Sequence, residues 1–422
     1  MIENILSLGK KIIPTKIFHT VQPVYHFLMA FFGALYYRFP SRKIFIIGVT
    51  GTKGKTTITE LINAILENAG EKVALLNTIR FKIRNKEEKN LFKMTMPGRF
   101  FIQRFLYSAV NAHCKYAVIE MTSEGAKQFR HKFIALDSLI FTNIAPEHIE
   151  SHGSFENYLN AKLKIAHSLE NSPKKNKIVI VNSDDKYGEK FLKVLVKNKI
   201  PFSLKNAEPY ILSEKFTEIT FDGLKIHLKL VGTFSIYNVL AAINFAKSQN
   251  ISFNIIKNTL EKFEGVKGRV ERIDEGQDFT VIVDYAHTKE SLEELCKAFG
   301  KSEKICVLGS TGGGRDKWKR PEMGKIADNY CKHIILTNED PYDEDPVRII
   351  ENVAEGIIKN NPEIIIDRRE AIKKALTSAE KTDIVLITGK GTDPYIMESN
   401  GKKTPWSDAE VAREELRLLI NK

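Results

Sequence analysis

The amino-acid sequence predicts an α/β protein with two parallel sheets. Three observations lead to this fold class. From residue 41 onward, short apolar segments alternate with longer helical ones, most apolar segments are followed by a polar turn, and the first runs into a glycine-rich turn. At 422 residues the chain is too long for one hydrophobic core, so two or three domains are expected.

The expected strands fall into two series, both short and apolar as buried parallel strands should be. The first is Ile44–Val49, Val73–Asn77, Tyr116–Glu120, Ser138–Thr142 and Ile178–Asn182, and the second is Thr280–Val283, Ile305–Leu308, His333–Leu336 and Ile384–Thr388. Between them, a β-hairpin is expected in residues 202–230, turning at Asp222-Gly223. We therefore expect a short apolar and basic helical segment (1–40), a central domain (41–266) and a smaller Rossmann-like α/β domain (267–422).

Composition favours a soluble globular protein, with 43% hydrophobic and 27% charged residues. The formal charge of +12 is spread through the chain, and no nucleic-acid-binding module is visible. A basic proteome or an anionic small substrate therefore explains the charge better than nucleic acid does. The four cysteines are scattered, without zinc-site spacing. A reducing, cytoplasmic setting is therefore expected, and we expect a monomer.

The N-terminal segment contains an apolar run from Val24 to Tyr37, flanked by basic residues. No secretory signal is expected, because Lys10, Lys11 and Lys16 precede the run and no cleavage pattern follows it. As a helix the run would rise about 21 Å, less than the roughly 30 Å of a bilayer core. Two interpretations stay open: a helix packed on its neighbouring domain, or one lying at a membrane surface.

The most informative motif is IIGVTGTKGKTT, in which a strand runs into a glycine turn and then a helix expected to start near Ile58. Such a turn directs backbone N–H groups at phosphate oxygens. The turn and the residues that follow are Gly51, Thr52, Lys53, Gly54, Lys55, Thr56 and Thr57. We expect ATP on this turn, Lys55 at the β- and γ-phosphates and Thr56 at Mg²⁺, which makes the central domain a P-loop-type ATPase domain.

This shortened GTxGKTT motif resembles that of the Mur ligase family and the related folylpolyglutamate synthetases. The resemblance covers about residues 41–415 and is strongest to the branch that adds the third residue of the peptide stem, the tripeptide synthetases. It implies that Glu120 and His148 are metal ligands. It also implies that Lys162 is a catalytic lysine that CO₂ carbamylates.

Further motifs extend the resemblance along the chain. Thr95 and Ser123 would bind the muramoyl-peptide, although Met96 departs from the family's Thr-Thr-Pro. Asn238 would contact the nucleotide, with a helix-capping asparagine as the competing interpretation. In the C-terminal domain the resemblance implies Arg269 near the γ-phosphate, Asp284 and His287 facing the nucleotide, and Arg315 at the substrate.

The segment that selects the amino acid departs from the family pattern. Where diaminopimelate enzymes carry Asp-Asn-Pro-Arg, this chain has Glu339-Asp340-Pro341-Tyr342, and Gly389–Asp393 reads GKGTD. The resemblance places Glu339, Asp340, Tyr342, Gly389 and Asp393 at the amino acid. Without the arginine, a bidentate grip on a distal carboxylate is lost, which permits lysine or ornithine; Arg348 or Lys390 could substitute for it.

These parts imply an ATP- and Mg²⁺-dependent ligase that adds a diamino acid such as lysine, ornithine or diaminopimelate to a UDP-N-acetylmuramoyl-L-alanyl-D-glutamate-type acceptor through an acyl phosphate. Residues 1–40 are too few for the family's N-terminal UDP-binding domain, so the form of the acceptor stays open. Two alternatives remain: a folylpolyglutamate-, polyglutamate- or cyanophycin-type ligase, or a Mur-like ATP-binding subunit of an amidating complex.

Overall fold

A computed structural model describes residues 15–420 and divides the chain into two compact units, which we describe separately. The first unit contains residues up to 51 together with 66–142 and 159–201, and the second contains 52–65, 143–158 and 202–422. Lys10 and Lys11, which bear on the expected absence of a signal, lie outside the described residues.

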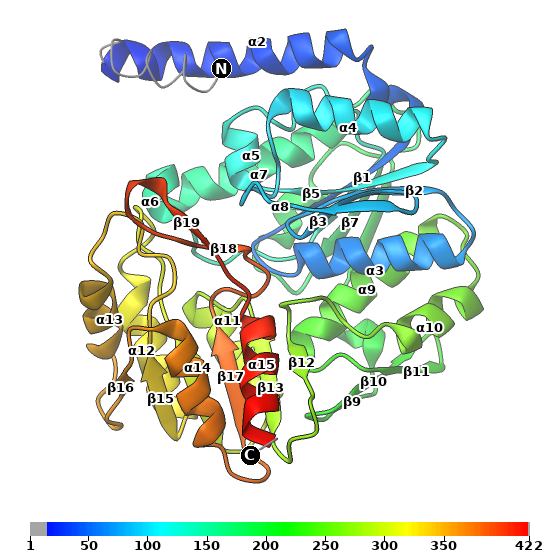
Figure 1. Ribbon diagram of the computed structural model, residues 1–422. Helices are drawn as coiled ribbons and strands as arrows, with labels where there is room; N and C mark the ends of the chain where they lie inside the picture. Colours follow the sequence, from blue (N-terminus) through cyan, green and yellow to red (C-terminus); the bar gives the residue numbers. More distant parts are fainter. Residues whose placement is uncertain (1–14, 421–422) are drawn as a thin grey trace. The chain divides into compact units, whose positions relative to one another are not determined.

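The first unit is built on an eight-stranded sheet in the order β4-β3-β2-β5-β1-β6-β7-β8 (Figure 1). Its strands are β1 (Phe45–Thr50), β2 (Val73–Leu76), β3 (Arg80–Ile83), β4 (Lys86–Lys89), β5 (Tyr116–Met121), β6 (Ser138–Phe141), β7 (Ile178–Asn182) and β8 (Asn198–Phe202). The central strands β2, β5, β6 and β7 are buried at every position, as expected of parallel strands covered on both faces.

Three strands of this sheet were not predicted: the edge strands β4 and β8, and β3 beside β4. β3 pairs antiparallel with β2, and β4 pairs antiparallel with β3. All four residues of β4, Lys-Glu-Glu-Lys, are exposed. An exposed charged strand has no apolar pattern for sequence reasoning to detect, and charged residues are common on sheet edges.

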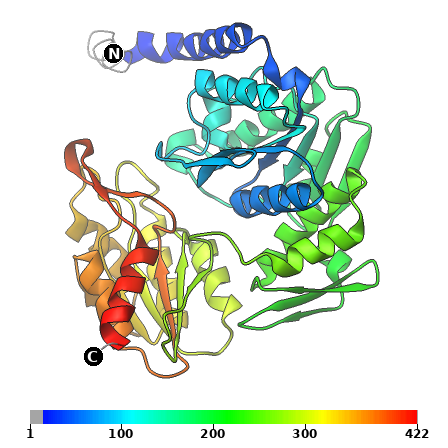
Figure 2. The same cartoon turned by 45° about the vertical axis from the view of Figure 1, so that its right-hand side comes forward.

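The helices of the first unit include one longer than the apolar run that predicted it. They are α2 (Thr15–Tyr36), α4 (Arg99–Asn111), α5 (Ser123–Lys127), α8 (Gly188–Leu192) and most of α7 (Phe155–Glu170), with the 3₁₀ turn η1 (Pro40–Lys43). α2 lies along α4 (Figure 2). Ala30, Gly33 and Ala34 are buried, and a Cβ on Gly33 would stand 3.4 Å from Phe100 of α4. Among the described helices, none has both the length and the apolarity to cross a bilayer.

The second unit contains a six-stranded sheet in the order β12-β13-β17-β14-β15-β16 and a three-stranded sheet in the order β11-β10-β9. The strands are β9 (Tyr210–Leu212), β10 (Thr217–Phe221), β11 (Leu224–Leu228), β12 (Glu271–Ile273), β13 (Thr280–Asp284), β14 (Lys304–Leu308), β15 (His333–Leu336), β16 (Glu363–Ile364), β17 (Ile384–Thr388), β18 (Tyr395–Met397) and β19 (Lys403–Pro405). The β10–β11 hairpin turns at Asp222-Gly223, as predicted.

The helices of the second unit are not confined to the six-stranded sheet, whose two faces are covered by the last five of them. They are α3 (Lys55–Asn68, of which residues 55–65 belong here), α6 (Ile149–His152), α9 (Thr233–Ser248), α10 (Phe253–Lys262), α11 (Lys289–Ala298), α12 (Lys319–Tyr330), α13 (Pro346–Ala354), α14 (Arg368–Thr377) and α15 (Asp408–Ile420), with the 3₁₀ turns η2 (Leu204–Ala207) and η3 (Ser399–Gly401). Side chains of one strand alternate between two cores: Cys306 packs among residues of α11–α13, whereas Ile305 and Val307 pack among those of α14 and α15.

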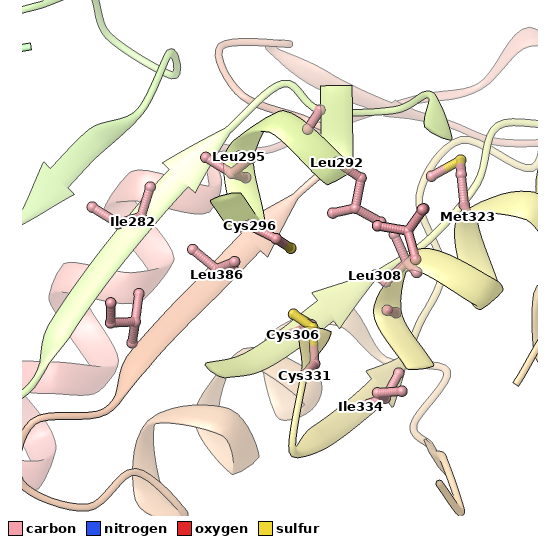
Figure 3. Close-up of a cluster of buried hydrophobic side chains, with 14 of the residues drawn as sticks. Ile282, Leu292, Leu295, Cys296, Cys306, Leu308, Met323, Cys331, Ile334 and Leu386 are labelled. Atoms are coloured by element: carbon pink, nitrogen blue, oxygen red, sulfur yellow. A yellow bond between two sulfur atoms is a disulfide. The ribbon is translucent and has the colours of Figure 1, made fainter. Parts of the chain in front are cut away.

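One of these cores contains a disulfide bond between Cys306 of β14 and Cys331 at the end of α12 (Figure 3). The third buried cysteine nearby, Cys296, is a free thiol whose pKa burial raises to about 12. The scattered spacing of the cysteines did not predict this pair, because the packing of α12 on the sheet, rather than sequence proximity, brings the two together.

Candidate active site

The glycine turn at Gly51–Gly54 joins β1 to α3, which begins at Lys55 rather than near Ile58. The turn is anchored by the segment after β6: Thr52 N donates to Asn143 O (2.8 Å) and Lys53 N donates to Asn143 Oδ1 (2.9 Å). Thr52 Oγ1 lies 2.8 Å from the hydroxyl of Tyr158. These contacts fix the first half of the turn, and the start of a helix supplies backbone N–H groups outside the intrahelical ladder.

Gly54 is required by both its backbone and its neighbour. Its φ is +83°, and a Cβ there would collide with Oδ1 of Asn238 in α9. Asn238 lies within α9, whose N-cap is Gly232, so the competing interpretation of Asn238 as a helix cap is wrong. The buried amide of Asn238 instead borders the turn.

The amine of Lys55 donates a hydrogen bond to the carbonyl of Thr52 (2.9 Å), within the turn itself. Thr56 is buried in the first turn of α3, beside Thr57. Residues 51–57 thus form a compact loop in which a lysine and a threonine hydroxyl accompany the start of a helix. This combination suits a bound phosphate chain.

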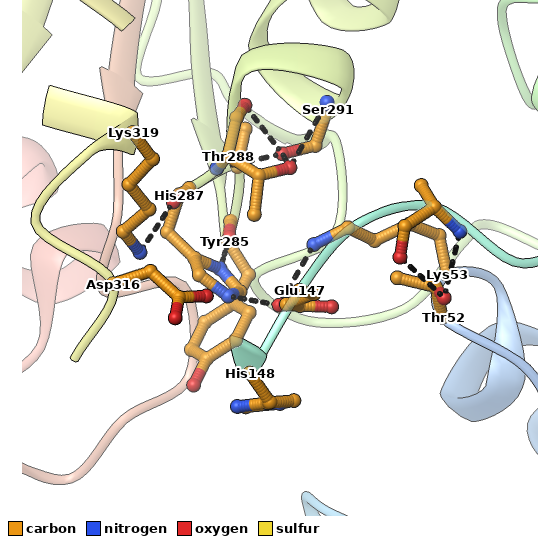
Figure 4. Close-up of polar contacts among 12 residues, drawn as sticks. Thr52, Lys53, Glu147, His148, Tyr285, His287, Thr288, Ser291, Asp316 and Lys319 are labelled. Carbon is orange, nitrogen blue, oxygen red and sulfur yellow. Dashed lines mark hydrogen bonds and ion pairs between the residues drawn. The ribbon is translucent and has the colours of Figure 1, made fainter. Parts of the chain in front are cut away.

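A polar cluster in the second unit surrounds Glu147, which sequence analysis missed (Figure 4). Lys53 Nζ and His287 Nε2 lie 3.3 Å and 2.9 Å from Glu147 Oε1. Burial by itself raises the pKa of Glu147. The Lys53 cation and the hydrogen bond with His287 nevertheless hold this pKa well below its usual range. Glu147 directly precedes the predicted His148, and the PEH triplet was the signal that could have found it.

His287 lies between two oxygen acceptors. Its Nδ1 is 2.7 Å from Tyr285 O, and its Nε2 faces Glu147. Full use of both contacts needs a proton on each nitrogen, yet burial and the nearby Lys53 cation lower the pKa of the ring to about 3. These effects outweigh Glu147, which raises the pKa of His287. The Lys319 cation, whose Nζ donates to His287 O (2.9 Å), lowers that pKa further. A neutral ring carries one proton, so it donates to only one of the two acceptors at a time.

His148 occupies the N-cap position of α6 in a left-handed conformation (φ 59°). Its Nδ1 lies 3.4 Å from Nη1 of Arg315, so the structure brings two predicted residues together. Asp316, adjacent to Arg315 and not predicted, accepts from the amides of Ile149 (3.3 Å) and Glu150 (2.9 Å) and so holds the start of α6.

In the first unit, Glu120 lies near the end of β5 and is buried. Its Oε2 accepts from Thr78 N (3.0 Å) and Thr78 Oγ1 (2.9 Å), and Thr78 Oγ1 is 2.8 Å from Thr95 Oγ1. Ser123 is buried at the first position of α5. The predicted metal ligand and a predicted substrate contact therefore share one hydrogen-bond network, linked by Thr78, which sequence analysis did not identify.

Lys162 is also buried in the first unit. Its amine donates to Gly51 O (2.7 Å), at the end of β1. The structure therefore buries this lysine against the first residue of the glycine turn, rather than placing it on the solvated helix face that its sequence context alone would suggest.

Two residues predicted in the C-terminal domain, Arg269 and Asp284, make different contacts. The guanidinium of Arg269 lies over the ring of Tyr285, 4.1 Å from its centroid. Asp284 accepts from Val270 N and Ala286 N (2.7 Å each), and burial raises its pKa. The carboxylate of Asp284 therefore holds the backbone at Val270 and Ala286. The resemblance to the family did not imply this contact.

The amino-acid selector residues meet in the second unit. Lys390 Nζ donates to Asp340 Oδ1 (2.7 Å) and Tyr395 O (2.6 Å) and lies 3.7 Å from Asp393 Oδ2. Tyr342 adopts φ 54°, and its ring lies against Gly313. Because the buried ammonium of Lys390 is already paired with Asp340, it is not available to replace the missing arginine, and Arg348 is exposed on α13.

Glu339 is the unusual member of this group. One oxygen, Oε1, accepts from Thr311 Oγ1 (2.7 Å), while Oε2 is buried and has no hydrogen-bond partner among the described residues. Burial raises the pKa of this carboxyl. Gly389, with φ +104°, leaves room for Oε2, since a Cβ there would collide with it. A buried carboxylate oxygen without a partner is costly unless something pairs with it.

Comparison with known proteins identifies two family models along the chain. The Mur ligase middle domain matches residues 49–246, and the Mur ligase glutamate ligase domain matches residues 268–391. The UDP-N-acetylmuramoyl-L-alanyl-D-glutamate--2,6-diaminopimelate ligase of Syntrophomonas wolfei is 37% identical over 406 residues, covering 92% of this chain and 81% of that protein. The protein of the same name from Aquifex aeolicus is 38% identical, covering 89% and 78%.

Solved structures show the same similarity in three dimensions. A structure of UDP-N-acetylmuramoyl-L-alanyl-D-glutamate--2,6-diaminopimelate ligase is 27% identical with a TM-score of 0.61, covering 90% of this chain and 79% of that one. Mycobacterium tuberculosis folylpolyglutamate synthase, complexed with ADP and AMPPCP, shares the fold with a TM-score of 0.69 at 13% identity, covering 94% and 95%.

Proposed function

The chain belongs to the Mur ligase family of ATP-dependent ligases, and we propose that it joins a diamino acid to a UDP-N-acetylmuramoyl-L-alanyl-D-glutamate-type acceptor. The observation that carries the proposal is the turn at Gly51–Thr57, anchored by Asn143 and bordered by Asn238, with Lys55 at the start of α3. The relatives' names supply the substrate class.

ATP fits this turn by the chemistry of its groups. Lys55 can exchange the Thr52 carbonyl for the β- and γ-phosphates, and the start of α3 favours negative charge. Gly51, Thr52, Lys53, Gly54, Thr56 and Thr57 complete the proposed phosphate site. Asn238, Arg269, Asp284 and His287 are proposed for the nucleotide, with Arg269 as the cation for the γ-phosphate.

The donor atoms of the three residues proposed for Mg²⁺ suit that ion chemically. Thr56 and Glu120 supply the oxygen ligands that Mg²⁺ prefers, and His148 supplies an imidazole. The bound ion would neutralise charge on the phosphates. Lys162, held at Gly51 O, is the proposed site of carbamylation, and Thr95, Ser123 and Arg315 are proposed for the acceptor.

The proposed reaction has two steps. The acceptor carboxylate attacks the γ-phosphorus of ATP, which forms an acyl phosphate and releases ADP. The amine of the diamino acid then attacks the acyl carbon, phosphate leaves, and an amide bond and a proton remain. The chain's contribution is to position the groups and stabilise charge, as in other phosphoryl transfers.

The selector residues support a substrate with a second ammonium group. The unpartnered Oε2 of Glu339 lies beside Gly389, in the group that also contains Asp340 and Asp393. An ammonium would supply the missing hydrogen bond. Tyr342 stands where diaminopimelate enzymes carry arginine, so we propose that lysine or ornithine is used at least as well as diaminopimelate.

An acceptor and amino-acid panel tests the proposed function. ADP formation is measured with UDP-N-acetylmuramoyl-L-alanyl-D-glutamate and, in turn, lysine, ornithine, diaminopimelate and alanine. We expect turnover with a diamino acid and none with alanine, and Glu339→Gln should raise the KM for the diamino acid by at least about tenfold, since a charged hydrogen bond is lost. The matched control is the same change at an exposed glutamate, Glu189→Gln, which should leave this KM unchanged.

Two outcomes of the panel would contradict the proposal. No turnover in this panel, together with turnover when glutamate and a folate-type or polyglutamate acceptor are supplied instead, would assign a folylpolyglutamate-type ligase. ATP binding without ADP formation in any combination would assign a non-catalytic subunit. The domain division at 41–266 and 267–422, the monomeric state and the cytoplasmic location remain predictions.

A further inference from the structure

The exposed face of α2 is apolar between Val21 and Leu35. Between Ile17 and Tyr37 the sequence contains no Asp, Glu, Lys or Arg. The side chains opposite the face that packs on α4 recur at intervals of three and four residues, which places them in one stripe. The members of this stripe are Val21, Val24, Leu28, Phe32 and Leu35, exposed by 55%, 58%, 43%, 51% and 50%.

A pocket of about 480 Å³ opens beside this helix, entirely within the first unit. Its apolar wall includes Phe27 of α2, Phe129 and Phe133, and the ring of Phe27 meets those of Phe129 and Phe133 at 6.1 Å and 5.4 Å between centroids. Phe27 is itself 41% exposed. The pocket wall and the exposed helix face are therefore continuous.

The pocket carries positive charge without an acidic residue in its lining. Arg42, Lys132 and Lys164 line it, and none of the three forms an ion pair with an acidic side chain among the described residues 21–420. Arg38 and Lys43, both exposed, extend the basic area at the end of α2. An aromatic cavity with three such cations is complementary to a ligand with an anionic group and a hydrocarbon portion.

We propose that the first unit docks on a membrane surface containing anionic phospholipids, with the stripe of α2 in the interface and the phosphate of one lipid headgroup in the pocket. A helix with an apolar face and basic residues at its end is the arrangement that binds such surfaces in the plane of the interface. The basic pocket favours a lipid surface over a second copy of the chain, because its cations would repel their equivalents in a symmetric pair.

Vesicle sedimentation tests this proposal with the full-length chain. Binding is compared between vesicles of phosphatidylcholine alone and vesicles that also contain phosphatidylglycerol. We expect binding only to the second. Lys132→Ala/Lys164→Ala should weaken it by roughly fivefold for each charge removed, and Leu28→Ser/Phe32→Ser by at least about tenfold.

Matched controls separate docking from folding and from general charge. Lys193→Ala/Lys197→Ala removes two exposed lysines of the same unit, and Leu195→Ser removes a leucine that is 76% exposed. Both controls should bind like the wild type, and all variants should keep its thermal midpoint and its ADP formation. Because that readout is separate, failure of vesicle binding leaves the proposed ligase activity untouched.

Three results would overturn the docking proposal. The first is equal binding of the wild type to both kinds of vesicle or to neither. The second is saturable binding of inorganic phosphate that depends on Lys132 and Lys164 in a protein that ignores vesicles, which would make the pocket a free-anion site. The third is a dimer in light scattering that Leu28→Ser/Phe32→Ser dissociates while vesicle binding is absent.

Discussion

At the scale of single residues, the contact between Gly54 and Asn238 shows why the phosphate turn has its sequence. Gly54 adopts a φ that other residues avoid, and the amide of Asn238 occupies the space where a side chain would project. The motif itself revealed Gly54, and the resemblance revealed Asn238. Glu147 was missed because its place directly before His148 was its one sequence signal, and that signal gives the glutamate no partner. Only folding places it beside Lys53 and His287.

Gly54→Ala should therefore weaken ATP binding by more than backbone strain explains. Gly223 is the matched control, because its φ is +77° and no atom lies within 4 Å of its added Cβ. Both substitutions should cost about 1–2 kcal/mol in stability. Only Gly54→Ala should also raise the Kd for ATP, by at least about tenfold, as measured by titration calorimetry. Equal ATP affinity in the two variants would show that Asn238 does not constrain the turn.

At the scale of elements, the short helix α6 depends on a distant loop for its start. Asp316 accepts from two backbone amides of α6, and Glu147 and His148 immediately precede that helix. In the loop that contains Asp316, the resemblance assigned a role only to Arg315. The capping task of Asp316 could not be predicted, because it joins segments far apart in the chain.

Asp316→Ala should loosen α6 and displace His148. Loss of a cap costs about 1 kcal/mol, and we expect kcat/KM to fall by roughly tenfold or more, since small displacements of catalytic groups are expensive. The control is Asp345→Ala, which removes the cap of α13 at Val347 N (2.9 Å). Thermal midpoints of both variants measure the loss of stability, and steady-state kinetics measure the effect of displacing His148. If Asp345→Ala lowers kcat/KM as much, α6 has no special role.

The buried strands were the easiest elements to predict. β7, β15 and β17 have the predicted bounds, because each is a short apolar run with a polar boundary. β4 and the β18–β19 pair were not predicted, since exposed or irregular sequences form strands only when a neighbouring strand supplies the hydrogen bonds. The start of α3 was placed three residues late because Lys55-Thr56-Thr57 was assigned to the turn.

At the scale of the whole molecule, two α/β sheets were predicted from alternating patterns and are present in the two units. The length of α2, and the fact that both its buried and its exposed face are apolar, were only partly predicted. One face packs on α4 through small residues, which confirms the packing interpretation for that face. The other face stays exposed, and its location at a membrane surface stays a prediction. The family is established by similarity along most of the chain.

The most direct test of the account compares amide-bond and ADP formation by the wild type and by Lys55→Ala, with Lys193→Ala as the control. The account predicts equal amounts of ADP and amide product that require ATP, acceptor and diamino acid together. Lys55→Ala should reduce this rate by at least about hundredfold, because the cation that stabilises the transferring phosphoryl group is removed. Undiminished amide formation by Lys55→Ala would contradict the account.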